Sequence, residues 1–334
     1  MSKLSNAGKT HQVDSRLNPD STQINQLFHI STFYHFFPLT DLDAVKVDLC
    51  KIAEKHKTLG LVIIGPEGLN STVAADSAEA LMQFKKELQD HFQIQIENFK
   101  DSFSDAPPFR RFSTKIRDEI VTAGLPGRSP EPGINHHLSP EEWDHVLKNE
   151  KDFVLIDTRN WYEYKIGTFK GAINPNIEKF TEFPAFFESQ HIPKEKKILI
   201  FCTGGIRCEK GILELQDKGY DNVFQLNGGI LKYMAEKPRQ EFEGECFVFD
   251  NRVAVNADLQ PSQVYKLCPH CGQPAHIKIE CKRCDEPALL CESCLELEWK
   301  KDTCSKNCSY QYSINPHKKG KHQVQHYEAA RLKK

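Results

Sequence analysis

The stretch Ile198-Leu-Ile-Phe-Cys-Thr-Gly-Gly-Ile-Arg-Cys208 constrains the fold of this chain more than any other. Its apolar first part, 198–201, predicts a buried strand, and helical spacing begins at Glu209. Helices and strands alternate from 139 to about 235, which predicts an α/β unit with a mostly parallel sheet. Such sheets place ligands at the carboxyl ends of their strands. Cys202 stands at such an end, so we expect it at a functional site.

The residues after Cys202 favour an anion at its sulfur atom. The loop that follows consists of Thr203, Gly204, Gly205 and Ile206. Its backbone N–H groups, the start of the next helix and the guanidinium of Arg207 would all stabilise a thiolate. We therefore expect Cys202 to be a catalytic nucleophile with Arg207 as its charge partner. The alternative is a small buried apolar residue at a strand end.

Three further residues are expected to support this loop. Cys208 is either a second, redox-active catalytic thiol or a core residue of the first helical turn, and the sequence leaves both open. Asp157 and Arg159 follow the apolar run 153–156, which predicts a buried strand. We expect them to form a structural ion pair that holds the loop from below.

Bulk composition indicates a soluble multidomain protein. The 334 residues suffice for two or three domains, and 39% hydrophobic residues, 27% charged residues and a net charge of -2 are ordinary for globular proteins. No apolar run reaches the roughly 18–20 residues that cross a bilayer. The polar start of the chain lacks the apolar core of a signal peptide. We therefore expect a cytoplasmic protein with no membrane partner.

Composition and periodicity divide the chain into five segments. Residues 1–21 predict a flexible N-terminal arm, and 125–138, rich in proline and glycine, predicts a linker. The segment 22–124 shows strand patterns at 27–34, 61–64, 70–74 and 94–99 and helical patterns at 41–57 and 77–91. This βαββαβ order predicts an α+β, ferredoxin-like (acylphosphatase-like) domain. The α/β unit occupies 139–250, and 251–334 is a cysteine-rich module with a basic tail.

Cysteine usage indicates metal binding rather than disulfides. Eight of the 12 cysteines form four close pairs: Cys268 and Cys271, Cys281 and Cys284, Cys291 and Cys294, and Cys304 and Cys308. Two pairs complete a tetrahedral site, so the module matches two zinc ions. Sequential and crossed pairing are both compatible with the spacing. We expect the zinc to be structural, because so short a segment has little core of its own.

The middle segment resembles the rhodanese domain. The motifs that carry the resemblance are Leu155-Ile-Asp-Thr-Arg159, Ile166-Gly-Thr-Phe-Lys-Gly-Ala-Ile173, the 202–207 loop and Leu226-Asn-Gly-Gly-Ile230. In that family the loop cysteine carries a persulfide or attacks a sulfur donor. A loop from Cys202 to Arg207 has the length typical of the sulfur-handling members. The chain departs from the pattern at Thr168, where many rhodanese domains have histidine.

Further motifs resemble the rhodanese-containing tRNA uridine hydroxylases of bacteria. They are Thr32-Phe-Tyr-His-Phe-Phe-Pro38, Glu67-Gly-Leu-Asn70, Lys115-Ile-Arg-Asp-Glu-Ile-Val121, Cys208-Glu-Lys210, Asn227-Gly-Gly-Ile-Leu-Lys-Tyr233 and Phe247-Val-Phe-Asp250. The resemblance implies 5-hydroxylation of the wobble uridine, position 34, in the anticodon loop of tRNA. It also implies molecular oxygen as co-substrate and Cys202 as the active-site cysteine.

The residues alone do not explain how oxygen would be activated. The sequence shows no 2-His-1-carboxylate iron set, no nicotinamide dinucleotide fingerprint and no flavin signature. Considered without the resemblance, the residues of this chain favour sulfur transfer or thiol redox chemistry. One alternative is therefore a rhodanese-type sulfurtransferase that loads a persulfide, for example from a sulfur donor protein. The other is a non-catalytic zinc- and RNA-binding protein.

Because the net charge is -2, an RNA-binding surface has to be local. The basic candidates are Arg110, Arg111, Lys115 and Arg117. They are interleaved with Phe109 and Phe112, which could stack on an unpaired base. The alternative for this stretch is a solvated face. The basic runs at 318–321 and 331–334 are interpreted as a solvated tail.

Overall fold

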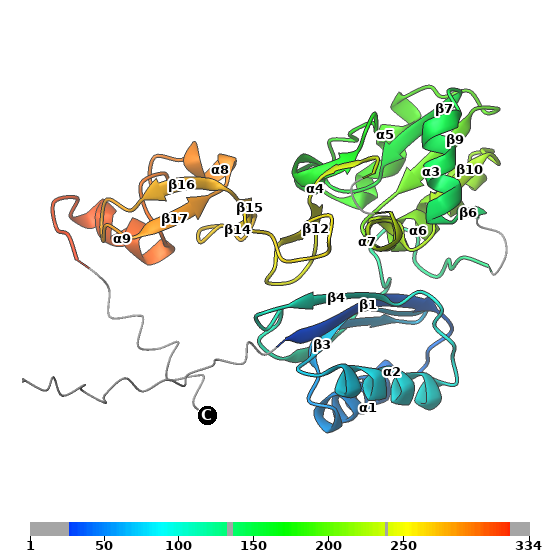
Figure 1. The fold of residues 1–334 in the computed structure, drawn as a ribbon, viewed down its shortest axis with the longest axis horizontal. Coiled ribbons are helices and arrows are strands. Elements are labelled where there is room, and N and C mark those ends of the chain that lie inside the picture. Colours follow the sequence, from blue (N-terminus) through cyan, green and yellow to red (C-terminus); the bar gives the residue numbers. More distant parts are fainter. Residues whose placement is uncertain (1–26, 132–135, 238–239, 321–334) are drawn as a thin grey trace, which may run out of the picture.

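The computed structural model describes residues 27–131, 136–237 and 240–320, which form three bodies in chain order (Figure 1). The arm expected at 1–21 and the basic run at 331–334 lie outside these residues. An N-terminal domain in blue and cyan is followed by an α/β domain in green, and a cysteine-rich module in orange comes last. None of the helices in the described ranges is long and apolar enough to cross a membrane.

The N-terminal domain is a five-stranded sheet with two helices on one face (Figure 1). Its elements are β1 (Phe28–Phe36), α1 (Leu42–Lys55), β2 (Leu59–Gly65), β3 (Gly68–Ala75), α2 (Ala78–Phe92), β4 (Lys100–Ser104) and β5 (Phe112–Ile116). The order β4-β1-β3-β2 with antiparallel neighbours confirms the predicted ferredoxin-like arrangement. Fully buried apolar side chains such as Leu49, Val62 and Phe84 form the core between helices and sheet.

Two parts of this domain differ from the sequence-based prediction. The strand predicted at 94–99 is wrong, because backbone N–H groups of this segment form hydrogen bonds to Gln89, near the C-terminus of α2. The N–H of Ile94 donates to the Gln89 carbonyl, and the N–H of Ile96 donates to the Gln89 side chain. The fourth strand instead starts at Lys100. The sequence also gives no fifth strand, but β5 pairs in parallel with β2 at the sheet edge.

The α/β domain has the predicted parallel sheet, in the order β6-β10-β9-β7. Its main elements are β6 (His136–Leu138), α3 (Pro140–Asn149), β7 (Phe153–Asp157), α4 (Trp161–Ile166), α5 (Phe183–Ser189), β9 (Lys197–Phe201), α6 (Ile206–Asp217), β10 (Val223–Leu226) and α7 (Gly229–Glu236). The smaller ones are β8 (Gly167–Phe169), the 3-10 helix η1 (Phe180–Glu182) and β11 (Phe242–Gly244). Strand β6 lies inside the stretch predicted as a linker.

Each face of this sheet is covered by helices. Trp143 of α3 and Tyr233 of α7 are fully buried on one face. Phe183 of α5 and Ile212 of α6 are buried on the other. Burial on both faces explains why the strands are continuous apolar runs, as parallel strands of α/β folds are.

The cysteine-rich module has little regular structure. At its start, β13 (Ala254–Val255) pairs with β12 (Cys246–Phe247), which still belongs to the segment before residue 251. Its other elements are β14 (Lys266–Leu267), β15 (Pro274–Ala275), β16 (Ile277–Glu280), β17 (Pro287–Leu290), α8 (Glu292–Leu295) and α9 (Lys306–Ile314). The strands pair only as two-stranded ribbons, and the cysteines themselves make up much of the small apolar clusters. So small a core needs a further constraint to fold.

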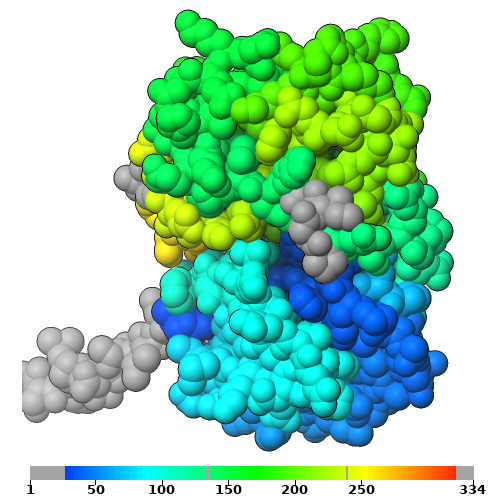
Figure 2. Space-filling view, turned by 90° about the vertical axis from the view of Figure 1, so that its right-hand side faces the viewer, coloured from blue at the N-terminus to red at the C-terminus, as the bar shows by residue number. Residues whose placement is uncertain are grey.

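The helix-free face of the N-terminal sheet packs against the α/β domain (Figures 1 and 2). The fully buried ammonium of Lys210, on α6, lies 2.6 Å from a carboxylate oxygen of Glu67 and 3.6 Å from one of Glu119. Lys210 also donates to the Leu125 carbonyl at 3.2 Å. Three of the motifs that carry the family resemblance therefore meet at this contact, and they fix α6 to the N-terminal domain.

Candidate functional site

The loop after β9 forms a cradle around the Cys202 sulfur. The N–H of Gly205 donates to that sulfur at 3.1 Å. Gly205 has a φ of 98°, and a Cβ there would stand 3.0 Å from the Tyr34 hydroxyl, so this position needs glycine. Behind the loop, the N–H of Ile230 in α7 donates to the Cys202 carbonyl at 3.0 Å. The predicted strand, loop and helix are thus present, with the thiol at the carboxyl end of β9.

The environment of Cys202 stabilises its thiolate. Burial raises the pKa of this thiol. The hydrogen bond from Cys208, the charge of Arg207 and the N–H groups of Arg207 and Gly205 outweigh burial and lower that pKa from 9.0 to about 6. Burial and the neighbouring Cys202 raise the pKa of Cys208 well above its usual value. At neutral pH the pair is therefore one thiolate and one thiol, and the thiol donates to the thiolate.

Arg207 is anchored inside the protein and does not reach out to solvent. Its Nη1 and Nη2 donate to the two carboxylate oxygens of Glu163 at 2.6 and 2.8 Å. Glu163 is fully buried; burial raises the pKa of its carboxyl, but Arg207 more than compensates, so the pKa is lowered. This bidentate pair fixes the loop to α4 and keeps a positive charge beside Cys202. The sequence identifies Arg207 but not its partner.

The ion pair predicted below the loop is present. Arg159 Nη2 lies 2.6 Å from Asp157 Oδ2, and both side chains are fully buried. The Thr168 hydroxyl donates to the same carboxylate at 2.9 Å, so the residue that departs from the rhodanese pattern supports this pair. Thr158, between the two charges, donates its N–H and its hydroxyl to the Phe201 carbonyl at 3.0 and 2.9 Å. The residues at the end of β7 thus fix Phe201, the residue before Cys202, by hydrogen bonds.

The N-terminal domain contributes groups that the sequence analysis did not select. The ammonium of Lys100 donates to the Gly204 carbonyl at 3.3 Å. The Tyr34 hydroxyl donates to Glu209 at 2.8 Å, and Glu209 also lies 2.9 Å from His137 Nε2. Tyr34 and Glu209 belong to motifs that carry the family resemblance, whereas nothing in the local sequence distinguishes Lys100. Its role depends on how two domains pack.

The basic candidates for RNA contact lie away from the 202–207 loop. Arg110, Arg111, Lys115 and Arg117 are all exposed, on or beside β5. This strand is at the sheet edge, three strands from β1, which is roughly 14 Å at the usual strand spacing. Phe112 is half-buried and packs against the core beside Phe84, with ring centroids 6.3 Å apart, so its stacking on a base stays a prediction. Phe109 is half-buried.

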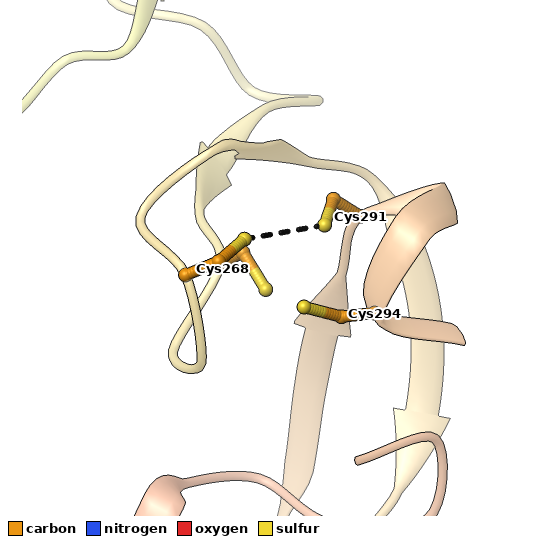
Figure 3. A group of neighbouring side chains, drawn as sticks. Cys268, Cys291 and Cys294 are labelled. Atoms are coloured by element: carbon orange, nitrogen blue, oxygen red, sulfur yellow. Dashed lines mark hydrogen bonds between the residues drawn. The ribbon is translucent and has the colours of Figure 1, made fainter. Parts of the chain in front are cut away.

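The eight clustered cysteines form two groups of four. One contains Cys268, Cys271, Cys291 and Cys294, and the other Cys281, Cys284, Cys304 and Cys308. In each group the sulfur atoms lie within 4.8 Å of one another. Figure 3 shows Cys268, Cys291 and Cys294 of the first group directed toward a common space. The pairing is therefore crossed: the first pair combines with the third and the second with the fourth.

The spacing of these sulfur atoms fits a tetrahedral metal ion. Four thiolates at about 2.3 Å from zinc stand roughly 3.8 Å apart. In the second group Cys304 and Cys308 are 3.6 Å apart and Cys308 and Cys284 3.8 Å. In the first group Cys271 and Cys291 are 3.4 Å apart. Both groups could therefore hold a metal ion.

Three family models match consecutive parts of the chain. Residues 28–120 match the UPF0176 acylphosphatase-like domain, 139–236 the rhodanese-like domain and 243–309 the rhodanese C-terminal domain. These ranges follow the three bodies described above. The second match places Cys202 and its cradle in a rhodanese-like domain, as the sequence motifs indicate.

Curated relatives cover most of the chain. A protein of Bdellovibrio bacteriovorus named tRNA uridine(34) hydroxylase is 60% identical over 92% of this chain and 87% of its own length. Proteins of the same name from Picosynechococcus sp. and Prochlorococcus marinus are each 38% identical over 80% of this chain, with 90% and 88% of their own lengths covered. On this similarity, together with the three domain matches, the chain belongs to the family of tRNA uridine(34) hydroxylases.

Proposed function

We propose that this protein hydroxylates C5 of the wobble uridine, position 34, of tRNA in an oxygen-dependent reaction in the cytoplasm. Relatives named tRNA uridine(34) hydroxylase match 80% to 92% of the chain. The observation that carries the proposal is the state of Cys202, a buried sulfur whose pKa is lowered to about 6. A thiolate at neutral pH in a preformed cradle is a ready nucleophile.

A thiolate can act on a uracil ring at C6, the electron-poor end of the C5–C6 double bond. When the Cys202 sulfur bonds to C6, the π electrons move toward C5 and the O4 carbonyl, and an enolate forms. This addition makes C5 nucleophilic, and C5 is the carbon that is hydroxylated. The positive charge of Arg207 and the backbone N–H groups of the loop stabilise the Cys202 thiolate before it attacks, and they favour negative charge on a uracil ring bound beside it.

Access to Cys202 requires movement. The side chain is 1% exposed, and the N-terminal sheet covers the loop. A base stacked in RNA cannot reach such an atom and has to leave its stack. The unpaired bases of an anticodon loop leave it most easily, so an anticodon loop suits the site as substrate. We assign contact with the RNA backbone to the exposed basic residues on and beside β5: Arg110, Arg111, Lys115 and Arg117.

We also propose that the two cysteine groups bind zinc and that this zinc has a structural role. All eight ligands are thiolates, and four-thiolate tetrahedral sites suit zinc. No fourth position is left open for water or substrate, as catalytic zinc would require. Each ion would join two segments of the module that lie apart in the sequence.

The test is an assay with purified protein, unmodified tRNA, isotopically labelled oxygen gas and a thiol reductant, followed by mass spectrometry of the nucleosides. The reductant supplies the two electrons that convert the second oxygen atom of O2 to water when the first is placed on C5. The proposal predicts 5-hydroxyuridine at position 34 that carries the label. Absence of this nucleoside under aerobic conditions, with folded and zinc-loaded protein, would refute the proposal.

The same preparation tests the two alternatives. A sulfurtransferase would load a persulfide on Cys202 from thiosulfate or from a sulfur donor protein and release thiocyanate with cyanide, with no change in the tRNA. A non-catalytic zinc- and RNA-binding protein would bind tRNA and release neither product. Labelled 5-hydroxyuridine that depends on Cys202 excludes both.

A further inference from the structure

Lys100 occupies an unusual position at the domain interface. It is the first residue of β4, its side chain is 5% exposed, and its ammonium faces the catalytic loop of the other domain. Within the described ranges its Nζ makes one hydrogen bond, to the Gly204 carbonyl at 3.3 Å, and lies 4.8 Å from the centre of the Tyr34 ring. An ammonium has three donors, so two of them have no protein acceptor here.

The other buried cations around this site are matched with carboxylates. The ion pairs are Arg159 with Asp157, Arg207 with Glu163, Lys210 with Glu67 and Arg252 with Asp250. Lys100 has no such pair among the described residues; its neighbour Asp101 pairs instead with Lys85. Burying an unmatched ammonium is costly, so a partner of opposite charge is expected nearby.

We propose that Lys100 is a second counter-ion of the Cys202 thiolate, beside Arg207, so that the N-terminal domain completes the active site of the α/β domain. The inference rests on the proposed function only in taking Cys202 as the reactive atom. Lys100 is a positioning residue: it holds the loop through Gly204 and stabilises the anionic sulfur. Burial lowers its own pKa to about 8, while the charges of Cys202 and Glu209 oppose that shift.

Several other groups influence the charge of Cys202 or of Lys100, and a test of this pair has to leave those groups unchanged. Arg207 and Cys208 stabilise the thiolate from α6. Glu209, also on α6, and Lys232, on α7, act on Lys100 with opposite signs. Tyr34 from β1 stays protonated, because burial and Glu209 raise its pKa well above the usual value. Among these groups only Lys100 and Tyr34 come from the N-terminal domain.

The experiment measures the thiol pKa of Cys202 in the full-length, zinc-loaded protein without tRNA. The rate of iodoacetamide alkylation is followed against pH, and the Cys202 peptide is identified by mass spectrometry. Lys100→Met keeps the length and removes the charge, and we expect it to raise this pKa by about one to two units, as loss of a close opposite charge does. Lys100→Arg restores the charge and should bring most of the shift back.

Lys85→Met is the matched control, because Lys85 pairs with the neighbour of Lys100 but on the helix-covered side of the sheet. It should leave the alkylation profile unchanged. A Lys100→Met profile that coincides with the wild-type profile, in a protein with unchanged circular dichroism, overturns the proposal even if 5-hydroxyuridine formation is established.

A reciprocal measurement covers the case in which Lys100→Met does not fold. If Lys100 lowers the pKa of Cys202, the Cys202 thiolate must raise the pKa of Lys100 by the same amount, because the coupling is reciprocal. In Cys202→Ser the pKa of the Lys100 amine, followed by nuclear magnetic resonance of labelled lysine, should fall by a similar amount. An unchanged Lys100 pKa in this conservative variant would mean that the two groups are not coupled.

Discussion

Glu163→Gln is expected to destabilise the α/β domain strongly. Both oxygens of Glu163 accept from Arg207, and the side chain is fully buried. The variant keeps the shape but leaves the buried Arg207 guanidinium without the carboxylate charge that it pairs with. Breaking a buried ion pair from one side costs about 3–5 kcal/mol, and because glutamine can still accept one hydrogen bond we expect about 3 kcal/mol.

Urea unfolding followed by tryptophan fluorescence measures this loss, since Trp143 is fully buried in the same domain. Glu182→Gln is the control: Glu182 is an exposed carboxylate of η1 that accepts from the Glu178 N–H at 3.0 Å, a bond that glutamine can also accept. Its change should stay within about 0.5 kcal/mol. A loss below about 1 kcal/mol for Glu163→Gln would refute the assignment of this pair as the anchor of the loop.

The difference in unfolding free energy between wild type and Glu163→Gln depends on pH in a direction that follows from the pKa of Glu163. The folded-state pKa of Glu163 lies below its usual 4.5, so the pair stabilises the protein above pH 4.5. That contribution disappears as the pH falls through the lower, folded-state pKa. The difference between wild type and Glu163→Gln should therefore shrink in acid and stay constant from pH 6 to pH 8.

Three further predictions concern the thiol, the metal and the RNA. Alkylation of Cys202 in the wild-type protein should be half-maximal near pH 6, since its pKa is about 6; a midpoint near the usual 9.0 would contradict the described cradle. Cys294→Ser should reduce bound zinc, measured by atomic emission, from two ions to about one, and loss of both ions or of none would contradict two independent sites. Replacing Arg110, Arg111, Lys115 and Arg117 with alanine should weaken tRNA binding by about tenfold or more at low salt and flatten its salt dependence, while unchanged binding would remove this surface from the proposal.

Local sequence patterns were enough to predict much of the fold. The apolar run into Cys202 and the glycines of the loop predict strand, cradle and helix without knowledge of the rest of the chain. The helical and strand periods of the N-terminal domain predict its ferredoxin-like order. These features depend on spacing over a few residues, which is what a sequence shows directly.

The errors come from competition between local pattern and tertiary contacts. The apolar residues at 94–99 alternate like a strand, but their N–H groups are used to end α2. Phe112 alternates with basic residues as in an RNA-binding segment, yet on β5 part of its ring packs against the core. In both cases the backbone partners, which the sequence does not show, decide the outcome.

The site was only partly predictable for the same reason. Cys202, Arg207 and the 157–159 pair lie on motifs of one domain. Lys100 reaches the loop from a different domain, and the crossed pairing of the cysteine groups depends on how α8 and α9 return to the ribbons. Contacts between segments far apart in the chain carry no local signal.

The central claim is that the ionised sulfur of Cys202 modifies uridine 34. The most direct test is the rate of 5-hydroxyuridine formation on tRNA against pH for the wild-type protein and for Cys202→Ser. The account predicts a wild-type rate that rises through pH 6 with the ionisation of Cys202 and no product from Cys202→Ser. Product formation by Cys202→Ser at the wild-type rate would contradict it.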